Sequence, residues 1–139
     1  MKPRIVVEPA EKWRAFRAAR VALAASGTVT LELALAGVPT VAAYRVSLIE
    51  EAIARLARLQ NLPSVILANL VIGENAVPEF LQSRCTPEIL AGAVAHLFAD
   101  ESARAAQVEA MKDFGRLLGE GDEAPSLRAA RVLLEFVEN

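Results

Sequence analysis

The sequence has few residues of the kinds that build disulfides, zinc sites and aromatic binding platforms. Among 139 residues it has one cysteine, one histidine and 5% aromatic residues. Cys85 cannot form an internal disulfide, which favours a reducing compartment. His96 has no second histidine and no cysteine at a ligand-like spacing, so we expect it to be structural and predict no metal site. Sparse aromatic side chains argue against stacking on single-stranded nucleic acid, and no nucleic acid or cofactor is expected.

Long apolar runs are also missing. A membrane-spanning helix needs about 18 or more uninterrupted apolar residues, and no such run occurs. Apolar residues nevertheless make up 54% of the chain, mostly as Ala, Val and Leu. That is ample core material for one domain of the usual size, about 100–150 residues. We therefore expect residues 1–139 to belong to one domain, which can be soluble or peripheral to a membrane.

The first third of the chain alternates short apolar runs with helical stretches. The runs have no polar alternate face, which is typical of strands covered on both sides by helices in a parallel sheet. Strands are predicted at Ile5–Val7, Val21–Ala25 and Thr40–Tyr44, and helices at about Ala10–Ala19 and Thr30–Ala36. The fold class predicted from this order is α/β, with a parallel sheet and flanking helices.

Helices dominate the remainder, which predicts a helical carboxyl-terminal tail. Capping signals open two of them, at Ser47-Leu48-Ile49-Glu50 and at Thr86-Pro87-Glu88. Further helices are predicted at Pro78–Ser83, Ala103–Leu118 and Leu127–Val137, with a flexible polar connection at Gly119–Asp122. The apolar run of Ser64–Gly73 is interpreted as a strand that carries Asn69 towards its end and leads into a polar turn at Gly73-Glu74-Asn75.

The turn Ser26-Gly27-Thr28 is the most informative candidate site. A buried strand leads into it just where a helix begins, so free helical amides, the helix dipole and the hydroxyls can hold a phosphate. Gly27 lets the phosphate approach the backbone. Small hydroxylated residues at such turns are also common as simple helix caps, and the residues alone leave both interpretations open.

Three further polar residues lie where a ligand could use them. Glu32 falls about one helical turn after Thr28 and can accept hydrogen bonds from ribose hydroxyls, or it can be a solvent-facing carboxylate. Arg45 follows the strand that ends at Tyr44 and can pair with a phosphate or a carboxylate. The amide of Asn69 can bind a substrate or hold its own loop together.

Two blocks of the sequence resemble a known family. The segments SGTVTLELALAGVPTVAAYRVS and ANLVIGENAVPEFLQSRCTPEIL are similar, in order and spacing, to the carboxyl-terminal region of lipid-A-disaccharide synthases. The first block is also found in looser form in other glycosyltransferases with two facing Rossmann-like domains. The second block points much more specifically to lipid-A-disaccharide synthases. The resemblance implies a partial Rossmann-like sheet.

The family transfers a diacylglucosamine from UDP to 2,3-diacylglucosamine 1-phosphate at the cytoplasmic membrane face. The resemblance therefore implies UDP-2,3-diacylglucosamine as donor, a lipid acceptor and no metal. It places Ser26, Gly27 and Thr28 against the diphosphate, Glu32 on the ribose and Asn69 in a motif that completes the donor site. It also implies a cytoplasmic protein, peripheral on the inner membrane, and a homodimer with exchanged carboxyl-terminal segments.

Members of this family are longer than this chain, and the amino-terminal acceptor domain and its acidic candidates for general base have no counterpart here. We therefore expect a glycosyltransferase segment that is inactive by itself. Two alternatives remain from the sequence: a non-catalytic association module acting through the helical tail, and a different UDP-sugar glycosyltransferase or epimerase of the same fold.

Overall fold

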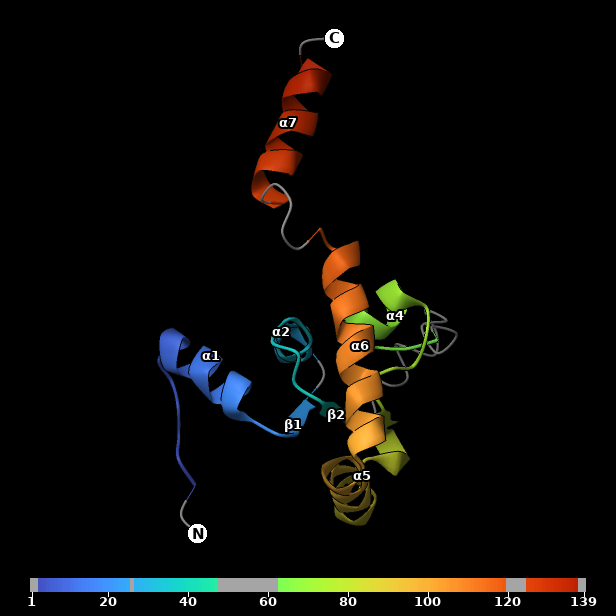
Figure 1. The fold of residues 1–139 in the computed structure, drawn as a ribbon. Helices are drawn as coiled ribbons and strands as arrows, with labels where there is room; N and C mark the ends of the chain where they lie inside the picture. The colour runs from blue at the N-terminus through green and yellow to red at the C-terminus, as the bar shows by residue number, and fades with distance from the viewer. Residues whose placement is uncertain (1–2, 26, 48–62, 120–124, 138–139) are drawn as a thin grey trace.

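The computed structural model describes residues 3–25, 27–47, 63–119 and 125–137. Three strands and seven helical segments occur in these ranges, and Figure 1 shows their arrangement. The strands are β1 (Ala22–Ala25), β2 (Thr40–Tyr44) and β3 (Glu79–Leu81). The helices are α1 (Pro9–Ala18), α2 (Thr28–Leu35), α4 (Leu67–Ile72), the 3-10 turn η2 (Gln82–Arg84), α5 (Pro87–Ala99), α6 (Glu101–Leu117) and α7 (Pro125–Val137).

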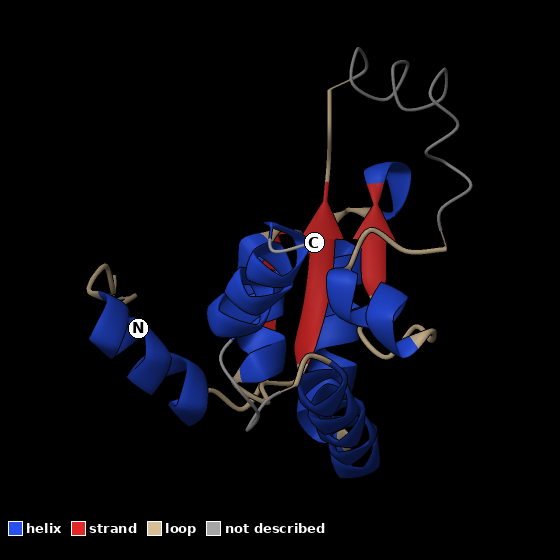
Figure 2. Cartoon of the chain, turned by 90° about the horizontal axis from the view of Figure 1, so that it is seen from above, coloured by secondary structure: helices blue, strands red, loops and turns tan. Residues whose placement is uncertain are grey.

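The strands form a parallel sheet in the order β1-β2-β3. Ala22 of β1 pairs with Thr40 of β2, and Ala42 of β2 pairs with Glu79 of β3. All carboxyl ends therefore lie at one edge of the sheet, and Figure 2 shows β2 and β3 pointing the same way. This is the edge at which open α/β sheets bind ligands.

The main core lies where α2, α4 and α6 meet the sheet. Phe114 of α6 is fully buried, and Ile66 and Met111 are 1% and 3% exposed. A smaller cluster centred on Ala24, Leu33 and Val38 packs beneath α1, together with Phe16. The second cluster matters for the site because it fixes α1 beside α2.

Hydrogen bonds from side chains to the backbone fix the ends of several of these elements. The amide of Gln107 in α6 accepts from the Thr40 backbone N–H at 2.8 Å and donates to the Thr40 carbonyl at 3.2 Å. Asp100 caps α6 by accepting from the Ala103 backbone N–H, and this hydrogen bond holds the pKa of Asp100 below its usual value. Thr86 caps α5 in the way its sequence predicts, accepting from the Ile89 N–H.

Most of the predicted elements are confirmed. The strands at Val21–Ala25 and Thr40–Tyr44 correspond to β1 and β2, and the parallel α/β architecture is as expected. Helices α1, α2, α5, α6 and α7 match their predicted positions within a few residues. The helix expected to open at Ser47-Leu48-Ile49-Glu50 lies, apart from Ser47, outside the described residues, as does most of the Gly119–Asp122 connection.

Three predictions are wrong. Ile5–Val7 forms no strand: Ile5 and Val7 are 85% and 83% exposed, and the segment pairs with none of the described strands. The run Ser64–Gly73 forms helix α4 instead of a strand, ended by Gly73 in the left-handed conformation at φ 83°. The segment expected as a helix at Pro78–Ser83 forms strand β3 and enters η2, because the second edge of β2 binds it.

Helix α7 is set apart from this core. Figure 1 draws it beyond the end of α6, and its large apolar side chains are exposed, including Leu133 at 67% and Phe136 at 86%. An exposed apolar face on an amphipathic helix is typical of a surface that packs against another protein segment or a membrane. None of the described helices is both long and apolar enough to cross a bilayer.

Candidate functional site

The turn between β1 and α2 presents uncapped helical amides at the carboxyl end of β1. Gly27 is the N-cap residue, with φ 138° and ψ −157°, a conformation that L side chains rarely adopt, and no side chain of the described residues caps the helix. The Thr30 hydroxyl donates to the Gly27 carbonyl at 2.7 Å, away from the first-turn amides. Gly27 and Thr28 are exposed, while Ser26 lies outside the described residues. Neither Thr28 nor Thr30 is a simple cap, so this turn keeps donors for an anion.

Glu32 is paired with a lysine that the sequence analysis did not single out. Its Oε1 lies 2.6 Å from Nζ of Lys12 in α1, and the Lys12 and Glu32 side chains are 35% and 25% exposed. Glu32 is therefore not the purely solvent-facing carboxylate that the sequence left open. The signal for Lys12 was weak because it lies 20 residues away on another helix.

Arg45 follows the carboxyl end of β2 and is exposed. The loop that carries it is held by Gln82, whose Oε1 accepts from the Val46 backbone N–H at 2.8 Å. Gln82 has φ 47°, a conformation that costs a side-chain-bearing residue energy.

Asn69 holds its own loop together. Its amide donates to the Val77 carbonyl at 2.9 Å and to Ser64 Oγ at 3.3 Å, and its Oδ1 accepts from the Val77 N–H at 2.9 Å. Asn69 is only 2% exposed. Of the two interpretations that the sequence left open, this is the loop-holding one.

The candidate residues are not all at one edge of the sheet. Gly27, Thr28 and Arg45 follow the carboxyl ends of β1 and β2. Val77 precedes β3, which starts level with Ala42, so Asn69 lies near the amino end of β2. Four strand residues at roughly 3.3 Å each, about 13 Å, separate the two edges. Asn69 therefore cannot touch a ligand held by Gly27 in the same chain without a change of structure.

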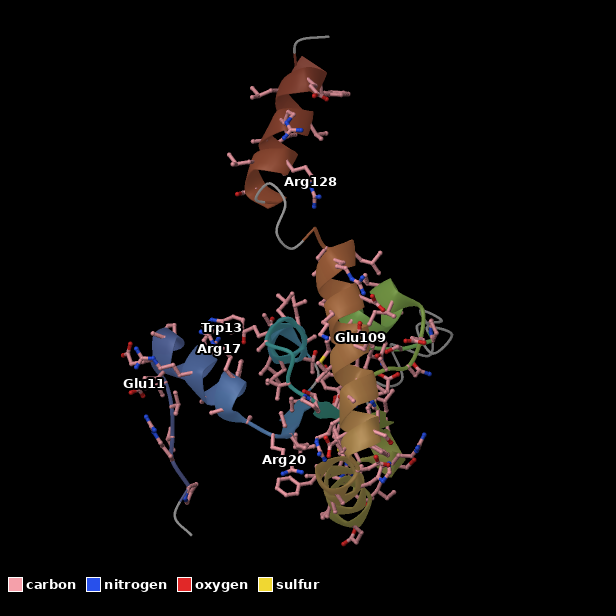
Figure 3. The ribbon with its side chains drawn as sticks, in the orientation of Figure 1. Glu11, Trp13, Arg17, Arg20, Glu109 and Arg128 are labelled. Carbon is pink, nitrogen blue, oxygen red and sulfur yellow. The ribbon has the colours of Figure 1, made fainter. Side chains whose placement is uncertain are left out.

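An open groove of about 710 Å³ lies between α5, α6 and the start of β3. Apolar side chains such as Phe80, Ile89 and Leu97 line it, and Glu74, Glu88 and His96 also contribute to its wall. Trp13, in contrast, packs edge-to-face against Phe16 with ring centroids 5.9 Å apart. Figure 3 draws Trp13 on the side of α1 that faces α2.

A parallel sheet flanked by helices, whose first strand passes through a glycine turn into a helix, is a Rossmann-like α/β fold. A family model described as lipid-A-disaccharide synthetase matches residues 4–131. The chain belongs to the lipid-A-disaccharide synthetase family.

Curated relatives agree with this assignment. A lipid-A-disaccharide synthase of Bradyrhizobium diazoefficiens is 54% identical over 134 residues, which is 96% of this chain and 34% of the relative. One of Nitrobacter hamburgensis is 53% identical over 135 residues, 97% of this chain and 34% of the relative. One of Paramagnetospirillum magneticum is 44% identical over 135 residues, 97% and 35% respectively. The chain thus spans about a third of the length of these relatives.

Proposed function

We propose that this chain provides the UDP-binding part of a glycosyltransferase that joins UDP-2,3-diacylglucosamine to 2,3-diacylglucosamine 1-phosphate, forming lipid A disaccharide. The observation that carries the proposal is the uncapped start of α2 at the carboxyl end of β1, with a carboxylate one turn further along the helix. Family membership supports the choice of donor and acceptor.

Each residue of the turn has a role in this proposal. The amides of Gly27 and Thr28, with the hydroxyls of Ser26 and Thr28, bind the UDP diphosphate, and Glu32 accepts from the ribose hydroxyls. Arg45 contributes positive charge at the same edge of the sheet. Stabilising the diphosphate lowers the barrier because it is the leaving group when the acceptor hydroxyl attacks the anomeric carbon.

Asn69 acts indirectly, or on another site. It fixes the loop between Ser64 and Val77, and it contributes to a donor site only through this loop or in a partner molecule. A base that deprotonates the acceptor hydroxyl is also needed. In our proposal that base belongs to a part of the enzyme with no counterpart in this chain, so the chain binds nucleotide but does not turn over. The proposed setting is the cytoplasmic face of the inner membrane.

Isothermal titration of the chain with UDP tests the nucleotide site. Replacing Glu32 with Ala should weaken UDP binding by roughly 10- to 150-fold, since losing a hydrogen-bonded charged acceptor costs roughly 1.5–3 kcal/mol. Glu109→Ala is the matched control, because Glu109 also pairs with a lysine but lies on the exposed face of α6. Equal UDP affinity in the wild type and Glu32→Ala would disprove the ribose assignment.

The homodimer with exchanged carboxyl-terminal segments is a second proposal, favoured by α7. Its apolar face is uncovered, its polar side carries Arg128 and Arg131, and the apolar groove beside α5 includes Glu74 and Glu88. Light scattering should give twice the monomer mass, and Leu133→Glu should restore the monomer. Glu135→Gln, a change on the polar side of α7, should leave the mass unchanged. A monomeric wild type, with or without UDP, would refute the exchange.

A further inference from the structure

The ion pair between Lys12 and Glu32 differs from three other ion pairs of the described residues. The pairs Arg4–Glu11, Lys112–Glu109 and Arg116–Asp113 are local in sequence, and their side chains are 46–77% exposed. Lys12 and Glu32 belong to two different helices, and both side chains are more than half covered. An exposed local pair contributes little, whereas a partly covered pair between two elements fixes side-chain geometry.

The surroundings of Lys12 hold its ammonium group in place. Nζ lies 6.0 Å from the ring centroids of both Trp13 and Phe16. Phe16 packs against the cluster of Ala24 and Leu33, which anchors α1 to β1 and α2. The lysine is therefore held from both sides, by the aromatic rings of its own helix and by the carboxylate of α2.

We propose that Lys12 is a positioning residue that prepares Glu32 for a ribose, so that the pair selects a ribonucleotide over a 2′-deoxyribonucleotide. The inference rests on the proposed function, in which Glu32 accepts from the ribose hydroxyls. Lys12 does not touch the nucleotide in this arrangement. It acts through the carboxylate that it holds.

Two physical effects lead to this role. A carboxylate has about four lone-pair sites on its two oxygens, so one contact from Lys12 to Oε1 leaves acceptor capacity for a hydroxyl pair. The ammonium group also offsets the negative charge of Glu32, which lies about one helical turn from the proposed diphosphate position and would otherwise repel it. Lys12 thus orients the carboxylate of Glu32 and reduces its electrostatic repulsion of the diphosphate.

The test compares the affinity of the chain for UDP and for 2′-deoxy-UDP by isothermal titration. The ratio of the two affinities is the readout, because losing a positive charge weakens the binding of both nucleotides. We expect the wild type to prefer UDP about tenfold, which corresponds to about 1.4 kcal/mol. Lys12→Met should reduce the preference to about twofold or less, and Lys12→Arg should retain most of it. Lys112→Met, which breaks the exposed pair with Glu109, should leave the ratio unchanged.

The outcomes separate this inference from the proposed function. If Glu32→Ala removes the preference and Lys12→Met keeps it, Lys12 does not position Glu32 and the inference is wrong, while the ribose assignment stands. If Glu32→Ala keeps the preference, the ribose assignment itself fails. A double variant that combines Glu32→Ala with Lys12→Met should show the same preference for UDP as Glu32→Ala alone, since the two residues act as one unit. Circular dichroism checks the fold, and Lys12→Gln serves as a second uncharged variant with the same expectation.

Discussion

Replacing Asn69 with Ala should destabilise the chain strongly, although no ligand is involved. The change removes both partners of the Val77 backbone, the donor to its carbonyl and the acceptor from its N–H, each at 2.9 Å. Val77 is only 2% exposed, so water does not readily replace the lost amide. An unsatisfied buried polar group costs about 1–3 kcal/mol, so two of them predict a loss of about 2–6 kcal/mol.

The assay is urea unfolding followed by circular dichroism, with the free energy of unfolding extrapolated to water. Total stabilities of domains are about 5–15 kcal/mol, so a loss of this size lowers the midpoint visibly. Asn75→Ala is the control, because Asn75 is an exposed amide in the same loop region. Its effect should stay within about 0.5 kcal/mol. A similarly small effect of Asn69→Ala would refute the view that Asn69 holds the loop.

Three further changes test the core, a helix end and a helix cap. Phe114→Ala should cost about 3–5 kcal/mol in the same assay, because it empties a fully buried position. Gly73→Ala should cost about 1–2 kcal/mol, since Gly73 ends α4 in the left-handed region at φ 83°; Gly92→Ala in α5 is its control and should be neutral or stabilising. The backbone hydrogen bond from Ala103 lowers the pKa of Asp100, so its carboxylate stabilises the fold fully above its unfolded pKa of about 3.9 and loses this effect as the pH falls through the lower folded value. Wild type should therefore melt higher than Asp100→Ala at pH 7, and the difference in Tm should shrink below about pH 4; a difference independent of pH would contradict this.

The parts of the fold that local sequence patterns determine were predictable. Thr86 and Pro87 specify the start of α5 through a side-chain cap and a fixed backbone angle, and the structure has both. The apolar run Thr40–Tyr44 reads as a buried strand, and residues of β2 are buried by helices from other parts of the chain. Each of these signals lies within a few residues of the element that it specifies.

The parts that depend on distant partners were not predictable. Residues Glu79–Leu81 form a strand because the edge of β2 pairs with them, and their local pattern favours a helix equally well. Ile5–Val7 has the composition of a strand but no pairing partner among the described strands. The site shows the same division: the glycine turn was visible in the sequence, whereas Lys12 reaches Glu32 only because Phe16 packs α1 against the second core cluster.

The most direct test of the central claim is a nuclear magnetic resonance titration of the ¹⁵N-labelled chain with UDP. We expect the largest shift changes on the backbone amides of Gly27 and Thr28 and on the residues around Glu32, at the carboxyl end of β1. Shift changes confined to the groove between α5 and α6, or none at millimolar UDP, would contradict the claim that this turn holds the nucleotide.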